Sequence, residues 1–151
     1  MKFNTIKFEE IRQQLETITQ FELITVMGLH QEKACRCYTN RPDIYALSGM
    51  KDTIKDDWYN LVITNKTPFI CHDQKTLIDI LKDETQFIAN NWGAAVNLPV
   101  QHNGNVIGTV NLLSKADAFK TLDLDNAVTI VQQSSELIAE FVESLMVAED
   151  A

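Results

Sequence analysis

The feature that most constrains the fold is a pair of apolar runs joined by Asn103-Gly104, in the stretch AVNLPVQHNGNVIGTVNLL at residues 95–113. Asn and Gly readily adopt the two positive φ angles of a type I′ turn, which matches the twist of two antiparallel strands. The stretch therefore predicts a β-hairpin. Two amides, Asn97 and Asn111, interrupt its apolar runs, and a polar side chain in a sheet needs a hydrogen-bond partner.

The register of this hairpin decides which face of the sheet each amide occupies. If the Asn-Gly pair forms the centre of the turn, Asn97 pairs with Val110 and Asn111 pairs with Val96, so the two amides point to opposite faces. One amide then needs a structural partner and the other faces a ligand. A one-residue bulge near Pro99 would reverse the assignment of Asn97, so the sequence leaves open which amide faces the ligand.

Periodicity elsewhere in the chain predicts helices at both ends and a mixture of helices and strands between them. Helices are predicted at residues 8–18, 58–65, 75–93 and 121–147. Strands are predicted at residues 22–30, 33–40 and 67–72 and in the hairpin, and residues 41–53 are predicted to form a loop. Hairpin-connected strands between terminal helices predict the α+β class, with an antiparallel sheet of about five or six strands.

Composition narrows the possible functions. A chain of 151 residues with 45% hydrophobic content can bury one core, so residues 1–151 are expected to form a single domain. A net charge of −8 would repel polyanions, so neither nucleic acid nor a membrane is expected as a partner. Charged residues interrupt every apolar run of the first 18 residues, which is typical neither of a signal peptide nor of a membrane span. The chain also has three cysteines, an odd number. The N-terminal pattern and the cysteine count together favour reduced thiols and a cytoplasmic protein.

The second half of the chain resembles the GAF domain, a small ligand-binding and regulatory module. Residues 91–142 are similar to that family's Pro-containing strand, tight turn, Val-Ile-Gly strand, short loop and long C-terminal helix. Residues 36–53, RCYTNRPDIYALSGMKDT, and 58–70, WYNLVITNKTPFI, resemble a branch of free-standing bacterial GAF proteins. The positions that match this branch are Arg36, Tyr38, Thr39, Asn40, Tyr45, Gly49, Lys51 and Trp58.

The resemblance implies a twisted antiparallel sheet with the N- and C-terminal helices on one face and a ligand pocket on the other, closed by the central loop and helices. It implies a small-molecule-binding sensory or regulatory protein, and it specifies neither the ligand nor a cofactor. Aromatic and polar side chains in or beside the pocket segments are the expected ligand contacts. These are Arg36, Tyr38, Tyr45, Trp58, Phe69, Trp92, Asn97 and Asn111. The long C-terminal helix further predicts a homodimer through residues 5–19 and 121–147.

The cysteines raise an alternative from the enzyme class. Free methionine (R)-sulfoxide reductase, a free-standing GAF enzyme, needs a thiolate nucleophile and a second cysteine that resolves the sulfenic acid. This chain has Cys35, Cys37 and Cys71, but the segment that matches the glycine-flanked cysteine of the reductase reads IKDDWYNL at 54–61. Because no catalytic motif is recognisable, we expect a binding protein. A thiol-dependent reductase and a purely structural dimerisation module remain the alternatives.

A metal site is not expected from the same residues. Cys35, Cys37, Cys71 and His72 are suitable ligand types for zinc, but their spacing matches none of the usual zinc knuckles. Cysteines on strands also need no metal to explain them, because cysteine is often buried as a small apolar side chain.

Overall fold

The computed structural model describes residues 2–150, with side chains described up to residue 147, and is built on one six-stranded sheet. The sheet order is β3-β2-β1-β6-β5-β4, and every neighbouring pair is antiparallel. The strands are β1 (Leu23–His30), β2 (Lys33–Thr39), β3 (Met50–Asp52), β4 (Phe69–Cys71), β5 (Ala94–His102) and β6 (Asn105–Ser114). The α+β class and the antiparallel sheet predicted from the sequence are confirmed.

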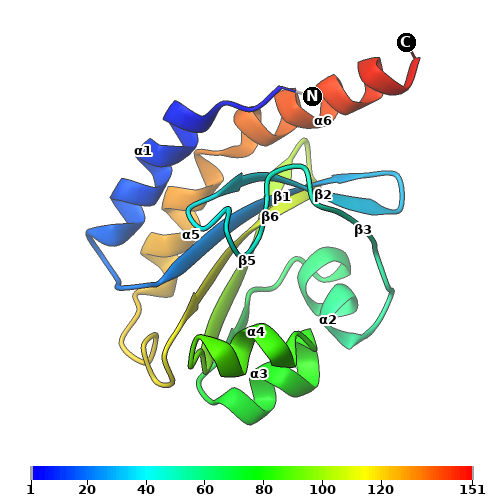
Figure 1. The fold of residues 1–151 in the computed structure, drawn as a ribbon. Helices are drawn as coiled ribbons and strands as arrows, with labels where there is room; N and C mark the ends of the chain where they lie inside the picture. The colour runs from blue at the N-terminus through cyan, green and yellow to red at the C-terminus, as the bar shows by residue number, and fades with distance from the viewer. Residues whose placement is uncertain (1, 151) are drawn as a thin grey trace.

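The helices form two layers on the two faces of this sheet (Figure 1). They are α1 (Thr5–Glu16), α2 (Asp57–Tyr59), the π-helix η1 (Asn60–Thr64), α3 (Gln74–Leu81), α4 (Glu84–Ala89), α5 (Leu124–Gln132) and α6 (Ser135–Asp150). Helices α1, α5 and α6 pack on one face, which confirms the predicted position of the terminal helices, and α2, α3 and α4 lie on the other face.

The predicted C-terminal helix at 121–147 is corrected to two helices, α5 and α6, separated by Gln133 and Ser134. Ser134 is fully buried, and its hydroxyl group and its backbone N–H donate to the carbonyl oxygen of Val131 at 2.6 and 2.9 Å. Such bonds three residues back tighten the last turn of a helix and end it. The apolar spacing continues across this break, so the periodicity did not reveal it.

Two other predicted segments are also corrected. The helix predicted at 75–93 is divided into α3 and α4, because Lys82 has a left-handed φ of 66° and its N–H donates to the carbonyl of Ile78 at 2.9 Å. The predicted loop at 41–53 contains the edge strand β3. All three side chains of β3 are exposed, so no alternation of apolar residues marked it as a strand.

The register predicted for the hairpin is wrong by one residue. The Asn103-Gly104 turn forms as expected, but the pairing shifts beyond Val100, where Ile107 is the extra residue of a bulge in β6. Asn97 therefore pairs with Asn111, and both amides point to the same face. Because side chains alternate between faces, one inserted residue is enough to move a side chain across the sheet.

The core beneath the terminal helices depends on two glycines that pair across β1 and β6, Gly28 and Gly108. A Cβ atom on Gly28 would lie 3.0 Å from Phe141 Cδ1 of α6, and one on Gly108 would lie 3.0 Å from Ile138 Cγ2. Both helix side chains are fully buried. The glycines thus allow α6 to lie close against the sheet, as close helix–strand contact requires.

A second bulge places Tyr38 under the helices. Val26 pairs with Tyr38 and Met27 with Arg36, so Cys37 is the extra residue, and Arg36 and Tyr38 point to opposite faces. The Tyr38 ring stacks on Phe8 of α1, with 5.8 Å between the ring centroids. The expectation that Tyr38 faces the ligand pocket is therefore corrected, because regular alternation from Arg36 does not hold across the bulge.

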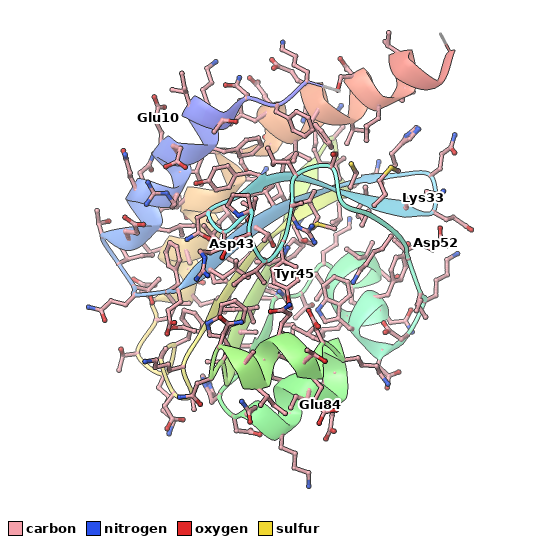
Figure 2. All side chains as sticks on the ribbon, viewed as in Figure 1. Glu10, Lys33, Asp43, Tyr45, Asp52 and Glu84 are labelled. Carbon is pink, nitrogen blue, oxygen red and sulfur yellow. The ribbon has the colours of Figure 1, made fainter. Side chains whose placement is uncertain are left out.

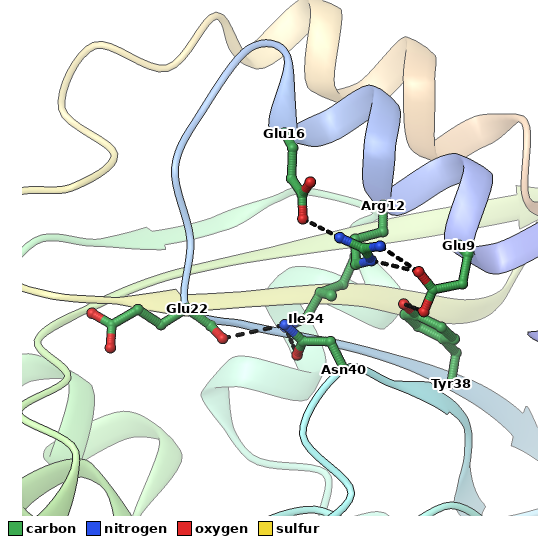
Figure 3. Close-up of polar contacts among 7 residues, drawn as sticks. All are labelled: Glu9, Arg12, Glu16, Glu22, Ile24, Tyr38 and Asn40. Carbon is green, nitrogen blue, oxygen red and sulfur yellow. Dashed lines mark hydrogen bonds and ion pairs between the residues drawn. The ribbon is translucent and has the colours of Figure 1, made fainter.

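The hydroxyl group of Tyr38 joins a polar network on α1 (Figure 3). It donates to Glu9 Oε1 at 2.5 Å, and Arg12 Nε donates to Glu9 Oε2 at 2.8 Å, while Arg12 also contacts Glu16. Burial acts to raise the pKa of Glu9, but the hydrogen bonds from Tyr38 and Arg12 outweigh it, and the pKa is lowered below its usual 4.5.

This network predicts an acid-dependent loss of stability. A carboxyl group whose pKa is lower in the folded state stabilises the protein above its unfolded pKa, and that contribution is lost as the pH falls through the folded pKa. We expect Glu9→Gln to lower the thermal midpoint at pH 7 and to differ progressively less from the parent below about pH 4.5. Thermal melts at pH 7 and in acid measure this. Glu10→Gln is the exposed control, and an equal deficit at both pH values would contradict the prediction.

Candidate functional site

A pocket of about 420 Å³ opens on the face of the sheet opposite the terminal helices. Its floor is formed by side chains of β1, β2, β5 and β6, and includes Thr25, Met27, Arg36, Asn97, Thr109 and Asn111. Residues 51–54 and Asp56, with Trp58 and Tyr59 of α2, form one wall. The α3–α4 turn and Phe87 form another. The pocket is thus enclosed by segments from the middle of the chain, as expected from the sequence.

A row of hydrogen-bonded side chains crosses the floor of the pocket; we call Trp58, Asn97, Asn111 and Thr25 the amide row. Trp58 Nε1 donates to Asn97 Oδ1 at 2.9 Å, and Asn97 Nδ2 donates to Asn111 Oδ1 at 2.9 Å. Asn111 Nδ2 then donates to Thr25 Oγ1 at 3.4 Å. Thr25, Asn111 and Asn97 are direct neighbours across β1, β6 and β5, so the sheet register creates the row.

The side chains of the amide row line the pocket, and the row does not use all of their hydrogen-bond donors. Each carboxamide has two N–H donors, and the row uses one N–H of Asn97 and one of Asn111. Thr25 accepts a bond there, and its hydroxyl hydrogen can be donated. The floor can therefore donate hydrogen bonds to a ligand without breaking the row.

Arg36 brings a positive charge to the same floor. Its Nη1 donates to the carbonyl oxygen of Ala46 at 2.8 Å, and its guanidinium carbon lies 5.1 Å from the centroid of the Tyr45 ring. Its Nε is buried and has no hydrogen-bond partner among residues 2–150. Burial lowers the pKa of Arg36, although nearby Tyr45 and Cys35 act in the opposite direction. The guanidinium is therefore a partly desolvated cation at the pocket.

The loop that follows β2 is joined to Arg36 by several hydrogen bonds. The backbone N–H of Arg36 donates to the Gly49 carbonyl at 3.0 Å, and the Ser48 N–H donates to the Arg36 carbonyl at 2.8 Å. Figure 2 shows Tyr45 between this loop and helices α3 and α4, where its hydroxyl group donates to Asp83. Burial, and then the bond to Asp83, raises the pKa of Tyr45, so the phenol stays protonated and can act as this donor.

The structure places five of the eight expected ligand contacts in the lining of the pocket. These are Arg36, Tyr45, Trp58, Asn97 and Asn111. Phe69 and Trp92 instead belong with Leu77 to the core cluster on the same face of the sheet as the pocket, and Tyr38 lies under α1. Aromatic residues near a pocket in sequence are equally suited to the core, and only the direction of each side chain separates the two roles.

Several residues of the pocket were not predicted from the sequence. Thr25 and Met27 lie in the run 22–30, which was predicted as a strand without any ligand contact, although a threonine within an apolar run was a usable sign of a polar position. Residues 51–53 belong to the loop that was expected to close the pocket, but they were not named as ligand contacts because no sequence period marks their side chains.

The cysteines lie away from this pocket wall. Cys35 and Cys37 are buried in the core cluster that includes the terminal helices, and Cys71 is buried in the second cluster with Phe69. Burial is the largest cause of the raised pKa of each of the three thiols. A raised pKa disfavours the thiolate, which is the nucleophile and the metal ligand. Within residues 2–150, no three His, Cys, Asp or Glu side chains gather as metal ligands would.

Comparison with known proteins identifies the fold. The sequence matches no protein-family model and no curated protein. The structure is similar to the GAF domain/HD domain protein from Geobacter sulfurreducens, with a TM-score of 0.70 and 12% identity over 90% of this chain and 91% of that one. It is also similar to the GAF domain of a two-component sensor histidine kinase from Bacillus halodurans, with a TM-score of 0.65 and 10% identity over 94% and 95% of the two chains.

A third similar structure is the type II free methionine-R-sulfoxide reductase from Thermoplasma acidophilum, with a TM-score of 0.61 and 17% identity over 90% of this chain and 96% of that one. These similarities show that the chain has the GAF-domain fold, which confirms the fold that the resemblance in the sequence implied. Within the described residues, no helix is both long and apolar enough to cross a membrane.

Proposed function

We propose that residues 1–151 form a single GAF module that binds a small molecule and acts in sensing or regulation. The observation that carries this proposal is a pocket of about 420 Å³ whose floor presents Arg36 and the amide row. Ligand sites typically combine apolar walls with a few placed polar groups, and this pocket has both. The three thiols, none of which forms a disulfide, support a reducing compartment such as the cytoplasm.

Thermal melts against a panel of metabolites test this proposal. A ligand that binds only the folded state at 100 times its Kd adds about 2.7 kcal/mol, which corresponds to a rise in the midpoint of about 5–11 °C for a chain of this size. We expect Trp58→Phe, which removes the first donor of the amide row, to reduce the rise. Trp92→Phe is the matched control, because Trp92 lies in the core away from the pocket wall.

A panel in which no compound raises the midpoint would contradict ligand sensing and favour the purely structural dimerisation module. The thiol-dependent reductase makes a different prediction, namely sulfoxide reduction by the parent protein that is lost in Cys37→Ser and Cys71→Ser. The pocket gives that alternative no support, because its wall is formed by other residues.

We also propose that the module is a homodimer through its terminal helices, residues 5–19 and 121–147. Large apolar side chains exposed on these helices support this interface. They are Ile6, Val128, Met146 and Val147. Sedimentation equilibrium tests the proposal: Ile6→Glu combined with Val147→Glu should give a monomer, whereas Ile88→Glu on α4 should not. A monomeric parent protein would contradict it.

A further inference from the structure

We propose that the pocket selects small organic carboxylates with an apolar body, and that Arg36 pairs with the carboxylate. This inference rests on the proposed function and adds the chemical class of the ligand. It follows from an imbalance in the pocket: the floor has a partly desolvated cation and several unused donors, while the carboxylates at the pocket already have partners.

The first step is the lack of a counter-charge at Arg36. A guanidinium has five N–H donors, and within the described residues Arg36 uses one of them, in the bond to the Ala46 carbonyl. Its other close contact, the Tyr45 ring, is neutral. A partly buried charge without a partner is costly, so an anion entering the pocket would be stabilised by it. The planar fork of a guanidinium matches the two oxygens of a carboxylate.

The second step is that the carboxylates lining the pocket do not supply this counter-charge. Asp56 is the N-cap of α2 and accepts a hydrogen bond from the Tyr59 N–H at 2.9 Å. Asp83 accepts a hydrogen bond from the hydroxyl group of Tyr45. The third, Asp52, has an 84% exposed side chain 4.0 Å from Lys33. Each carboxylate thus has a partner other than Arg36.

The third step concerns the remaining surface of the pocket. The amide row can donate further N–H and O–H bonds from the floor, so a ligand rich in acceptor oxygens matches it. The walls carry apolar side chains, including Ile54, Ile63, Leu81 and Phe87. A carboxylate on an aromatic or aliphatic body satisfies both surfaces, whereas a small inorganic anion would leave the apolar walls exposed to water.

Matched pairs of probes test this inference by isothermal titration. Phenylacetate, 3-phenylpropionate and indole-3-acetate are each compared with the primary amide of the same body, so that the pair differs in charge and keeps its shape. Because a hydrogen bond to a charged group is stronger than a neutral one, we expect each carboxylate to bind roughly 10- to 100-fold more tightly than its amide.

Variants assign the preference to a residue. Arg36→Gln should abolish the preference for the carboxylates, and Lys75→Gln, which removes an equal charge from an exposed position outside the pocket lining, should keep it. Arg36→Lys retains the charge without the fork and should keep part of the preference. If Arg36→Gln does not fold because it has lost the bond to Ala46, the Arg36→Lys variant still tests the inference.

The outcomes separate this inference from the proposed function. If the amides bind as tightly as the carboxylates, or if the preference survives in Arg36→Gln, the role of Arg36 is overturned while small-molecule binding stands. If no probe of the matched pairs and no compound of the metabolite panel binds, the proposed function fails, and the inference fails with it.

Discussion

Substituting Gly108 with alanine is expected to destabilise the protein by about 3 kcal/mol, since overpacking a tight interface typically costs this much. An added Cβ would lie 2.2 Å from the carbonyl oxygen of Met27 and 3.0 Å from Ile138 Cγ2. The first contact is with backbone of the neighbouring strand, so a change of side-chain rotamer cannot relieve it. The thermal midpoint should fall by about 6–12 °C, as measured by calorimetry.

Gly104→Asn is the matched control for this prediction. Gly104 has a φ of 81°, and an added Cβ would meet nothing within 4 Å among the residues described. Asparagine tolerates this left-handed conformation better than other residues, so the cost should be well below 1 kcal/mol. If Gly108→Ala costs no more than Gly104→Asn, then the close approach of β1 and α6 to β6 does not limit the stability of the fold.

Replacing Asn97 with leucine, which has a similar shape, is expected to destabilise the protein by about 2 kcal/mol, because it leaves partners of a buried amide without their bonds. Asn97 is 4% exposed, accepts from Trp58 and donates to Asn111. Both partners would lose a bond at 2.9 Å. Urea unfolding of Asn97→Leu measures the loss, and adding Trp58→Phe should give a double variant that loses less than the sum of the two single variants.

Thr25→Val is the control within the same row. Its bond from Asn111 is the longest of the three, at 3.4 Å, so its removal should cost less than about 1 kcal/mol. Equal losses from Asn97→Leu and Thr25→Val would show that water replaces the amide bonds at the pocket floor, and the row would then have no special role in stability.

Patterns within the sequence predicted the elements of this fold well, because periodicity and turn chemistry are local. Asn103-Gly104 specified a turn, and apolar spacing located the terminal helices and the longer strands. The breaks at Lys82 and Ser134 were missed because each arises from the backbone conformation of a single residue or from a buried hydroxyl group. Neither event disturbs the apolar spacing around it.

The site was predicted less completely, because its composition depends on two inserted residues. Ile107 moves Asn97 beside Asn111, and Cys37 moves Tyr38 away from Arg36. A bulge has no strong sequence signature, yet it reverses the face of every residue beyond it. The aromatic residues Phe69 and Trp92 were assigned to the pocket by the same logic that would assign them to a core, and packing alone separates these roles.

The bulge at Cys37 brings contacts with the layers on both faces of the sheet close together in one strand. Within three consecutive residues, one strand holds the loop above the pocket through Arg36 and holds helix α1 through Tyr38 and Glu9. The two layers therefore share a single stretch of backbone at this point, with no intervening layer of side chains. The covalent path from Arg36 on the pocket side to Tyr38 on the helix side runs through two peptide bonds.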